Sequence, residues 1–146
     1  LITTETSMVA PTVAHKPHIT YAYEEIIVFA LQAVIAAFHI DPQTWMDDKQ
    51  HLERYYSKSA LKQLDDQLFP GSGKGLCDQY IVQQISLNAI AREPAEITPI
   101  SDREWSITLP IILSDHRKIN NTLVVQPDPL APKGMIINHF QSQEVT

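Results

Sequence analysis

The sequence is poor in cysteine, in charged residues and in long apolar runs, and each shortage excludes a class of protein. Cys77 is the single cysteine, so no internal disulfide can hold the chain together. Charged residues make up 19% of the chain and the formal net charge is −6, so no excess of positive charge attracts nucleic-acid phosphates. We therefore expect a globular protein that does not bind nucleic acid.

The longest apolar stretch, residues 26–40, predicts a buried helix and not a membrane span. It lies between Glu25 and Asp41 in "EEIIVFALQAVIAAFHID", and Gln32 and His39 are its two polar residues. A helix that crosses the hydrocarbon core needs about 20 mainly apolar residues, and this run has fifteen. A helix that is apolar almost all round is buried on most sides of a folded domain. We therefore expect it to pack between a sheet and other helices.

The 146 residues suffice for one domain preceded by a short arm. Residues 1–19 show neither a helical nor a strand period, and Pro11 and Pro17 disfavour a helix there. Residues 20–146 are expected to form a single domain, since a chain of this length buries about two-thirds of its unfolded surface. The sequence begins with Leu1 and not with methionine, so we expect it to be processed or cut from a longer chain.

Three helices are predicted ahead of the strands. The first begins near residues 20–23 and ends before Pro42, because the residue before a proline avoids helical backbone. Thr44 is a suitable N-cap for a second helix, with Asp47 three residues on as in a weak capping box. Ser57 is placed to cap a third helix, which ends at the glycine-rich loop "FPGSGKG".

Four strands with short connections follow, and they predict an antiparallel meander. They are expected within residues 77–91, 103–115, 121–127 and 135–143. The second strand alternates best, and Pro110 on its polar face lacks an N–H, which indicates an edge or a bulge. In the last strand, Ile136 and Phe140 are two pleats apart and should share a face. Helices followed by such strands are typical of an α+β domain with a four-stranded antiparallel sheet.

The stretch "PGSGKG" at residues 70–75 looks like a phosphate-binding loop but departs from that motif twice. Leu68 stands where the motif requires its first glycine, and Gly75 stands where a magnesium-binding hydroxyl is required. The loop also follows a predicted helix, whereas the motif follows a strand. We therefore interpret these residues as a connector.

The histidines do not have the spacing of metal ligands. No two of them lie four residues apart, as they must to bind one ion from a single helix face. They are His15, His18, His39, His51, His116 and His139. We predict no metal site.

An enzyme or small-molecule binder is the alternative class to a binding module. A bent sheet and three helices can enclose a cone in which burial tunes the pKa of an acid or base. Asp41, Asp47, Tyr55 and Tyr56 are the residues to test; a ligand-sized cavity lined by Asp41 or His39 would favour this alternative, and a filled cone would oppose it. Otherwise the aspartates belong to helix ends and the tyrosines pack between helix and sheet. The chain has no G-x-S-x-G motif, and we expect no enzyme, no catalytic residues and no cofactor-binding residues.

Four segments, taken in order, resemble the IcmL/DotI family of type IVB (Dot/Icm-type) secretion systems, together with its conjugation relative TraM. They are "FALQAVIAAFHIDPQTW", "RYYSKSALKQL", "REWSITLPIILS" and "PLAPKGMIINHF". The resemblance covers about residues 20–142. It departs from the family at Ala60 and Leu61, where a Gly-Trp pair is expected.

The resemblance implies a fold and a place in the cell. The fold would be a nuclear-transport-factor-like cone with helices packed in a curved antiparallel sheet, as in the VirB-type assembly factors of other conjugative systems. Members of the family have a short cytoplasmic N-terminus, one transmembrane helix and a periplasmic domain that helps to assemble the inner-membrane complex. This chain would then be the periplasmic domain, anchored in the bacterial inner membrane by a segment upstream of Leu1.

Three functional hypotheses follow from the sequence. The first is a non-enzymatic scaffold subunit of a type IV secretion or conjugation channel, with the other subunits as partners and with self-association through exposed apolar surface. The second is a free periplasmic or secreted IcmL-like protein that binds partners without an anchor. The third is the enzymatic or ligand-binding cone described above.

Overall fold

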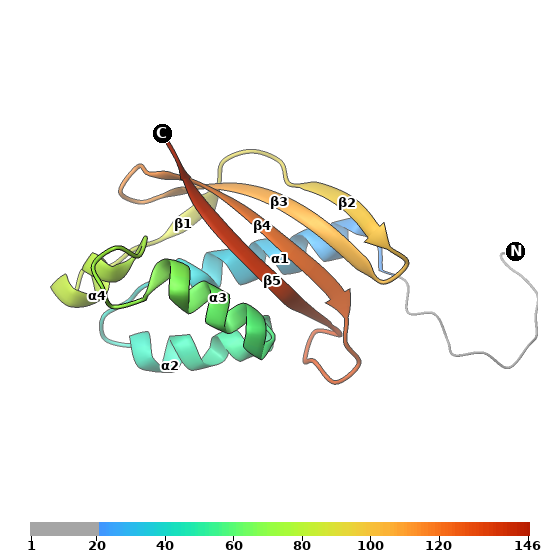
Figure 1. Ribbon diagram of the computed structural model, residues 1–146, viewed down its shortest axis with the longest axis horizontal. Coiled ribbons are helices and arrows are strands. Elements are labelled where there is room, and N and C mark those ends of the chain that lie inside the picture. Colours follow the sequence, from blue (N-terminus) through green and yellow to red (C-terminus); the bar gives the residue numbers. More distant parts are fainter. Residues whose placement is uncertain (1–20) are drawn as a thin grey trace, which may run out of the picture.

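Helices occupy the first half of the chain and strands the second half, as predicted. The structure is a computed structural model that describes residues 21–146, so the arm predicted at residues 1–19 lies outside the described residues. The helical elements are α1 (Tyr23–Ala37), α2 (Trp45–Gln50), the 3-10 turn η1 (His51–Arg54), α3 (Lys58–Leu68) and α4 (Asp78–Gln83). The strands are β1 (Ala89–Ala91), β2 (Glu96–Ser101), β3 (Glu104–Leu113), β4 (Lys118–Pro127) and β5 (Met135–Val145). Figure 1 shows the strands as one curved sheet with the helices gathered on one side of it, which confirms the α+β class.

The sheet is antiparallel throughout, and β1 and β2 share one position beside β3. The order is β1–β3–β4–β5, with β2 also paired to β3. β1 pairs with residues 111–113 of β3 and β2 with residues 104–108, so the sheet is four positions wide but has five strands, and β2 is not among the four that were predicted. Pro110 faces the break between them, where its carbonyl accepts the Arg92 N–H at 3.0 Å. The expected edge at this proline is therefore a local one, inside a central strand.

Helix α4 replaces the first half of a predicted strand. The alternation over residues 77–91 suggested a strand, but only β1 within it is extended. Cys77 and Tyr80, three residues apart, are buried, whereas Val82 is 81% exposed. This is the spacing of a short helix with one buried face, and the apolar residues in the segment matched a two-residue period by coincidence.

A bulge changes which side chain of β5 faces the core. Val124 pairs with His139 and Val125 with Ile137, so Asn138 is an extra residue in β5. Ile137 and Phe140 therefore both face the core and are fully buried, and Ile136 lies on the other face. The prediction that Ile136 would share a face with Phe140 was wrong because a bulge shifts the alternation by one residue.

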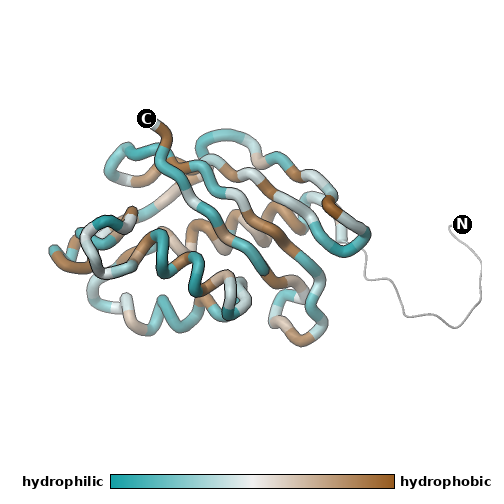
Figure 2. Tube along the Cα trace, viewed as in Figure 1, coloured by the Kyte–Doolittle hydropathy of each residue, from teal (hydrophilic) through white to brown (hydrophobic). Residues whose placement is uncertain are grey.

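Helix α1 is the central helix that the apolar run predicted. Its buried residues follow helical spacing and pack in the core beneath the sheet: Ile26, Phe29, Ala30, Ala33, Val34 and Ala37. Figure 2 shows hydrophobic residues concentrated along α1 and the central strands. Within residues 21–146, no helix combines the length and the apolar character that a membrane crossing requires.

One of the two predicted caps forms as expected. The Ser57 hydroxyl accepts the Ala60 N–H at 3.2 Å and caps α3. The Thr44 hydroxyl instead donates to Asp48 Oδ2 at 2.6 Å, and the box with Asp47 does not form. Asp47 stays exposed because Asp48, four residues after Thr44, is the carboxylate that the turn brings back to the cap.

The outer edge of β5 is closed by side chains of α3 and by the chain before it. Gln67 accepts the Ser142 N–H at 2.6 Å and donates to the Phe140 carbonyl at 2.9 Å. Gln63 accepts the Phe140 N–H at 2.8 Å. Ile137 exchanges backbone bonds with residues 55 and 57. These contacts fix α3 against the sheet and satisfy an edge that would otherwise be open.

Candidate functional site

One face of α1 is open, although most of the helix is buried. Glu25, Val28, Gln32 and Ile35 recur at intervals of three and four, so they form a single stripe along α1, and His39 lies just past the end of the helix. Val28 is 51% exposed, and the side chains of Gln32 and His39 are also exposed. This face of α1 therefore combines exposed apolar and polar side chains, the mixture that protein–protein interfaces use.

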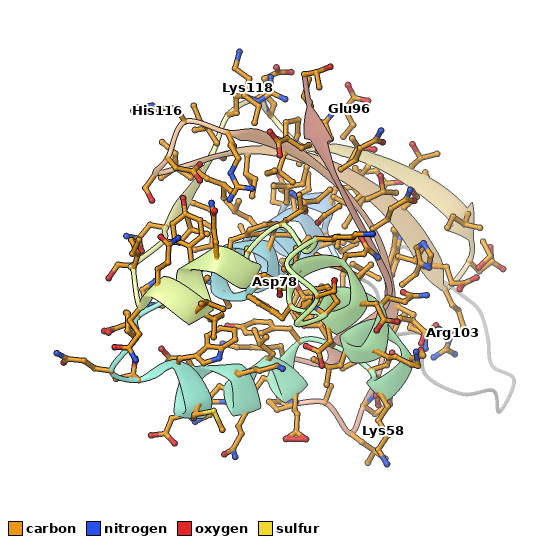
Figure 3. All side chains as sticks on the ribbon, turned by 60° about the vertical axis from the view of Figure 1, so that its left-hand side comes forward. Lys58, Asp78, Glu96, Arg103, His116 and Lys118 are labelled. Atoms are coloured by element: carbon orange, nitrogen blue, oxygen red, sulfur yellow. The ribbon has the colours of Figure 1, made fainter. Side chains whose placement is uncertain are left out.

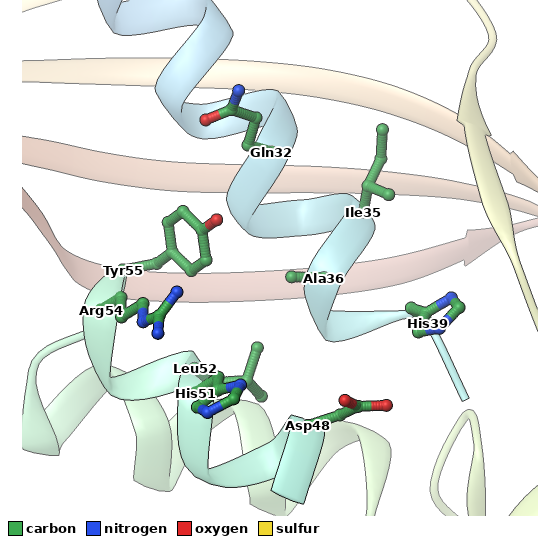
Figure 4. Close-up of a pocket in the computed structure, with 9 residues that line it drawn as sticks. All are labelled: Gln32, Ile35, Ala36, His39, Asp48, His51, Leu52, Arg54 and Tyr55. Carbon is green, nitrogen blue, oxygen red and sulfur yellow. The ribbon is translucent and has the colours of Figure 1, made fainter. Parts of the chain in front are cut away.

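Two hollows lie beside this stripe and share Gln32. The first, about 340 Å³, lies at the start of α1 against the β4–β5 turn and is lined by Glu24, Glu25, Val28, Phe29, Gln32, Lys133 and Met135. The second, about 470 Å³, lies between the end of α1 and the α2–η1 segment and is lined by Gln32, Ile35, Ala36, His39, Asp48, His51, Leu52, Arg54 and Tyr55. Figure 4 shows the α1 residues on one side of this hollow and those of α2 and η1 on the other. We call the stripe and its two hollows the α1 groove.

The two ends of the α1 groove carry different charges. Glu24 and Glu25 lie at the first end, where carboxylates also suit the positive end of the helix dipole. His39, His51 and Arg54 lie at the second end. Lys133 offsets one of the two carboxylates at the first end, and Asp48 offsets Arg54 at the second, so with histidine counted as neutral the second end has no net charge.

The tyrosine pair divides between the groove and the core. Tyr55 is partly buried, lines the groove and packs on Phe29 with ring centres 5.7 Å apart. Tyr56 is fully buried, donates to the Ala33 carbonyl at 2.7 Å and meets Phe140 edge to face. Burial raises the pKa of Tyr56 well above its ordinary value, and the neighbouring Tyr55 raises it further. Tyr56 and Phe140 thus belong to the packed core between the helices and the sheet.

The predicted acids do not join this site. Asp41 accepts the Gln43 N–H at 3.0 Å in a turn, and Asp47 is exposed on α2. His39 does line the groove, with its Nδ1 at 2.9 Å from Asn88 Oδ1. The four residues proposed for an enzymatic cone are therefore dispersed among a turn, a helix surface, the groove and the core.

The glycine-rich loop binds a carboxylate of its own chain. Asp78 accepts the N–H groups of Gly71 at 3.1 Å, Gly73 at 3.0 Å and Gly75 at 2.9 Å. Gly71 and Gly73 have φ of +79° and +83°, a conformation that turns their amides toward one anion at little steric cost. Figure 3 shows Asp78 enclosed between the helices, while the labelled Lys58 and Arg103 point outward. The amides that a phosphate would need are occupied by Asp78, in agreement with the connector interpretation.

A partly buried acid, Asp115, joins the β3–β4 turn to α4. Asp115 accepts the Tyr80 hydroxyl and the Arg117 guanidinium, the latter at 2.7 Å, as well as the Arg117 backbone N–H at 3.0 Å. Burial alone would raise the pKa of Asp115, but these hydrogen bonds outweigh it and hold that pKa below its ordinary value. Burial, followed by the bond to Asp115, raises the pKa of Tyr80. The cluster links α4 to the β3–β4 turn and so holds α4 on the sheet.

Asp115 should make stability depend on acid pH. Its pKa is lower when folded, so its contribution is complete above the unfolded value of about 3.9 and is lost as the pH falls through the lower, folded value. We expect D115N to be less stable at pH 7 and to lose less stability than the parent between about pH 4 and pH 2. Denaturant titrations at several pH values measure this, with exposed Asp66→Asn as the control. Parallel curves for D115N and the parent would contradict the assignment.

The described histidines do not gather around a metal. Among residues 21–146, no three His, Cys, Asp or Glu side chains are placed to hold an ion. His15 and His18 lie outside the described residues. Cys77 is buried, and burial raises the pKa of its thiol to about 12.

Sequence reasoning missed the α1 groove, although a signal was present. Glu25, Gln32 and His39 interrupt or bound the apolar run at intervals of seven residues, which places the first two on one face of α1 and the third just past its end. Burial on most sides was the correct inference for α1, and these three positions mark the side that is open. The contributions of η1 and the β4–β5 turn carry no comparable pattern.

The chain is similar to solved structures but not to sequence families. No protein-family model matches it, and no curated protein matches it in sequence. An IcmL-like type IV secretion system protein from Legionella pneumophila subsp. pneumophila str. Philadelphia 1 has TM-score 0.74 and 17% identity, over 86% of this chain and 95% of that one. The periplasmic domain of DotI has TM-score 0.71 and 16% identity, over 91% and 100% of the two chains. A periplasmic fragment of TraM has the same TM-score, 0.71, and 16% identity, over 86% and 100%.

The wider cone fold is shared as well. VirB8 of Agrobacterium tumefaciens has TM-score 0.58 and 11% identity, over 90% of this chain and 98% of that one. The fold expected from the resemblance is thereby confirmed. Over most of its length, the chain has the fold of the periplasmic domains of IcmL-like, DotI and TraM proteins of type IV secretion systems.

Proposed function

We propose that the chain is the periplasmic domain of a type IV secretion-system subunit and acts there in protein–protein assembly of the inner-membrane complex. The structural similarity to the periplasmic domains of DotI and TraM supports both the assignment to a type IV secretion system and the periplasmic location. Its partners are other subunits of the system, and the parent protein is anchored in the inner membrane by a segment upstream of Leu1. The net charge of −6 opposes a role on nucleic acid.

The observation that carries an assembly role is the α1 groove. Buried apolar side chains pack between the sheet and the helices, and the α1 groove lies at the surface of this core. Val28 and Ile35 give this surface an apolar centre, and charged residues surround it at both ends. An apolar centre with a polar rim is the usual composition of a protein–protein interface.

The dispersal of the candidate acids supports a non-enzymatic role. A general acid or base must lie within hydrogen-bond reach of a bound substrate. Asp41 and Asp47 lie outside both hollows, and the Tyr56 hydroxyl is bonded to a helix carbonyl in the core. The α1 groove therefore offers binding groups without a nucleophile and base in contact.

One observation favours the ligand-binding alternative. The second hollow has the volume of a small-molecule site and is lined by His39, the residue that this hypothesis named. It is open to solvent between α1 and η1, whereas ligand pockets enclose most of their ligand. A small-molecule screen by thermal shift distinguishes the ligand-binding alternative from the assembly role, since a ligand that binds only the folded state raises Tm.

Fractionation of the parent protein tests the proposed function. We expect it to stay with the inner membrane through a carbonate wash, to be cut by protease from the periplasmic side and to cross-link to other secretion subunits. A cytoplasmic protein known to be soluble, and a periplasmic binding protein, are the matched controls for the two compartments. Recovery as a soluble periplasmic or secreted protein would contradict the anchored scaffold and favour a free-standing partner-binding protein.

A further inference from the structure

We propose that residues 13–19 of this chain bind in the first hollow of the α1 groove and cover its exposed apolar side chain, Val28. These residues, "VAHKPHI", lie outside the described residues and shortly precede them. The arm is then an intramolecular cover of the contact surface, and an assembly partner must displace it. The inference concerns a contact within one chain, so it goes beyond the proposed function and is tested separately.

The described residues begin against a wall of this hollow. The Tyr21 hydroxyl donates to the Gly134 carbonyl at 2.7 Å. Lys133 and Met135, on either side of that glycine, both line the hollow. Gly134 has φ of +76°, and a Cβ there would lie 2.5 Å from the Tyr21 hydroxyl, so glycine permits this close approach. The residues that precede Tyr21 therefore start beside the hollow.

The hollow and the arm segment are complementary in charge. Glu24 and Glu25 outnumber Lys133 around the hollow, which leaves one net negative charge. The segment carries Lys16 together with two histidines and has no acidic residue. The second hollow has no such excess of negative charge. Opposite charges therefore favour the first hollow over the second as the place where the segment binds.

Apolar contact adds to the attraction between charges. Val28 is 51% exposed and shares the hollow with Phe29 and Met135, so the hollow has an apolar floor within an acidic rim. Val13 and Ile19 place apolar side chains at the two ends of the segment. Burying them against this floor removes apolar surface from water, which favours the bound arrangement.

The segment is long enough for this path. The lining residues extend along α1 from Glu24 to Gln32, which is a rise of about 12 Å. An extended chain covers about 3.3 Å for each residue, so about four residues span this length and the rest turn the chain back beside Tyr21. Pro17 disfavours a helix within the segment, and the backbone of Ala22 is extended.

Direct attachment makes even a weak contact effective. A segment joined to its site by a short connection is held there at an effective concentration on the order of millimolar. A contact too weak to form between separate molecules is therefore populated within one chain. A partner that binds the α1 groove has to compete with the arm, which lowers the apparent affinity of that partner.

Thiol labelling at Val28 tests the cover in the 146-residue chain. Val28→Cys should react with a maleimide about tenfold more slowly than Val82→Cys on α4, because a segment bound about nine-tenths of the time blocks the thiol. The two valines are 51% and 81% exposed in the structure, a difference too small to give that ratio. Cys77 is buried and its pKa is about 12, so the introduced thiol is the one that reacts. Circular dichroism confirms that both variants fold.

Charge reversal tests whether the arm is the cover. Lys16→Glu should speed the labelling of Val28→Cys about tenfold, because it places a carboxylate against the acidic rim. Lys62→Glu makes the same change of charge on an exposed residue of α3 and should leave the rate unchanged. Glu24→Lys added to Lys16→Glu should slow the labelling again, although a lysine beside a thiol by itself speeds it. A rate that does not respond to Lys16→Glu would overturn the proposal.

Dilution separates the arm from a second molecule in the hollow. An intramolecular cover protects Val28→Cys equally at every protein concentration. Protection that disappears on dilution would place another copy of the chain in the hollow and would overturn the arm as its occupant.

The outcome is distinguishable from that of the proposed function. Labelling of Val28→Cys that is as fast as its exposure allows, in a chain whose parent stays in the inner membrane and cross-links to secretion subunits, overturns the inference and leaves the assembly role standing. Slow labelling that depends on Lys16, in a chain whose parent is neither membrane-bound nor associated with secretion subunits, supports the inference and overturns the proposed function.

Discussion

Asp78→Ala should lower the free energy of unfolding by about 3 kcal/mol, the largest effect expected of a single polar side chain in this domain. The substitution removes three charge-assisted hydrogen bonds, from Gly71, Gly73 and Gly75, and leaves a space where a buried carboxylate stood. Water can reach part of the released loop, which keeps the loss below the sum of three full bonds. Urea unfolding followed by tryptophan fluorescence gives the value.

The same variant should also release the loop for proteolysis. Lys74 is exposed within it, so trypsin should cut D78A there faster than the parent. Asp66→Ala is the matched control, because that carboxylate forms only an exposed pair with Lys62. Unchanged stability and unchanged cleavage at Lys74 would show that the loop holds its shape without Asp78.

Gln67→Ala should lower the free energy of unfolding by about 2 kcal/mol and should make the protein prone to aggregate. The Gln67 amide satisfies the Ser142 N–H and the Phe140 carbonyl, so its loss frees two backbone groups on the edge of β5. Lys62→Ala removes a long polar side chain from the exposed face of the same helix and should change the free energy by less than about 0.5 kcal/mol. Denaturant unfolding and light scattering during incubation measure the two effects. An equally soluble, equally stable Q67A would contradict the role of α3 as cover of this edge.

The parts of the fold that the sequence predicted are those in which one periodic pattern runs through a whole element. The fifteen-residue apolar run is long enough to be α1 and too short to be a span, and the alternation around Trp105 is long enough to define β3. Pro110 was interpreted correctly as a local edge because a missing N–H has few places in a sheet. Ser57 marked the start of α3 because a serine just before a helix commonly caps it, with its hydroxyl accepting a free backbone N–H of the first turn.

The secondary-structure predictions were wrong where a segment is too short or too irregular to show a single period. Six residues of α4 are too few to separate a helical from a strand period. The bulge at Asn138 shifts the alternation of β5, and nothing in the residue itself announces it. The contacts of Gln67 and Asp78 could not be predicted either, because they depend on how α3 and α4 pack in the folded domain.

The residues of the candidate site also divide into those that a sequence pattern marks and those whose position depends on the fold. Glu25 and Gln32, seven residues apart in the sequence, mark the open face of α1, and His39 follows just past the end of that helix. The opposite wall, from Asp48 to Tyr55, was not predictable, since it depends on how the chain folds back after Pro42. Tyr55 and Tyr56 illustrate the limit: adjacent in the chain and identical in type, they lie in the groove and in the core.

The closed edge of β5 also limits how far copies of this sheet can join. The outer edge of β2 pairs with no other strand in residues 21–146, whereas β5 is covered from Ile137 to Ser142. A filament of sheets joined side by side requires two free edges on every copy. With one free edge, such joining ends at a pair, so the native domain cannot extend into a fibre by this route while α3 stays in place.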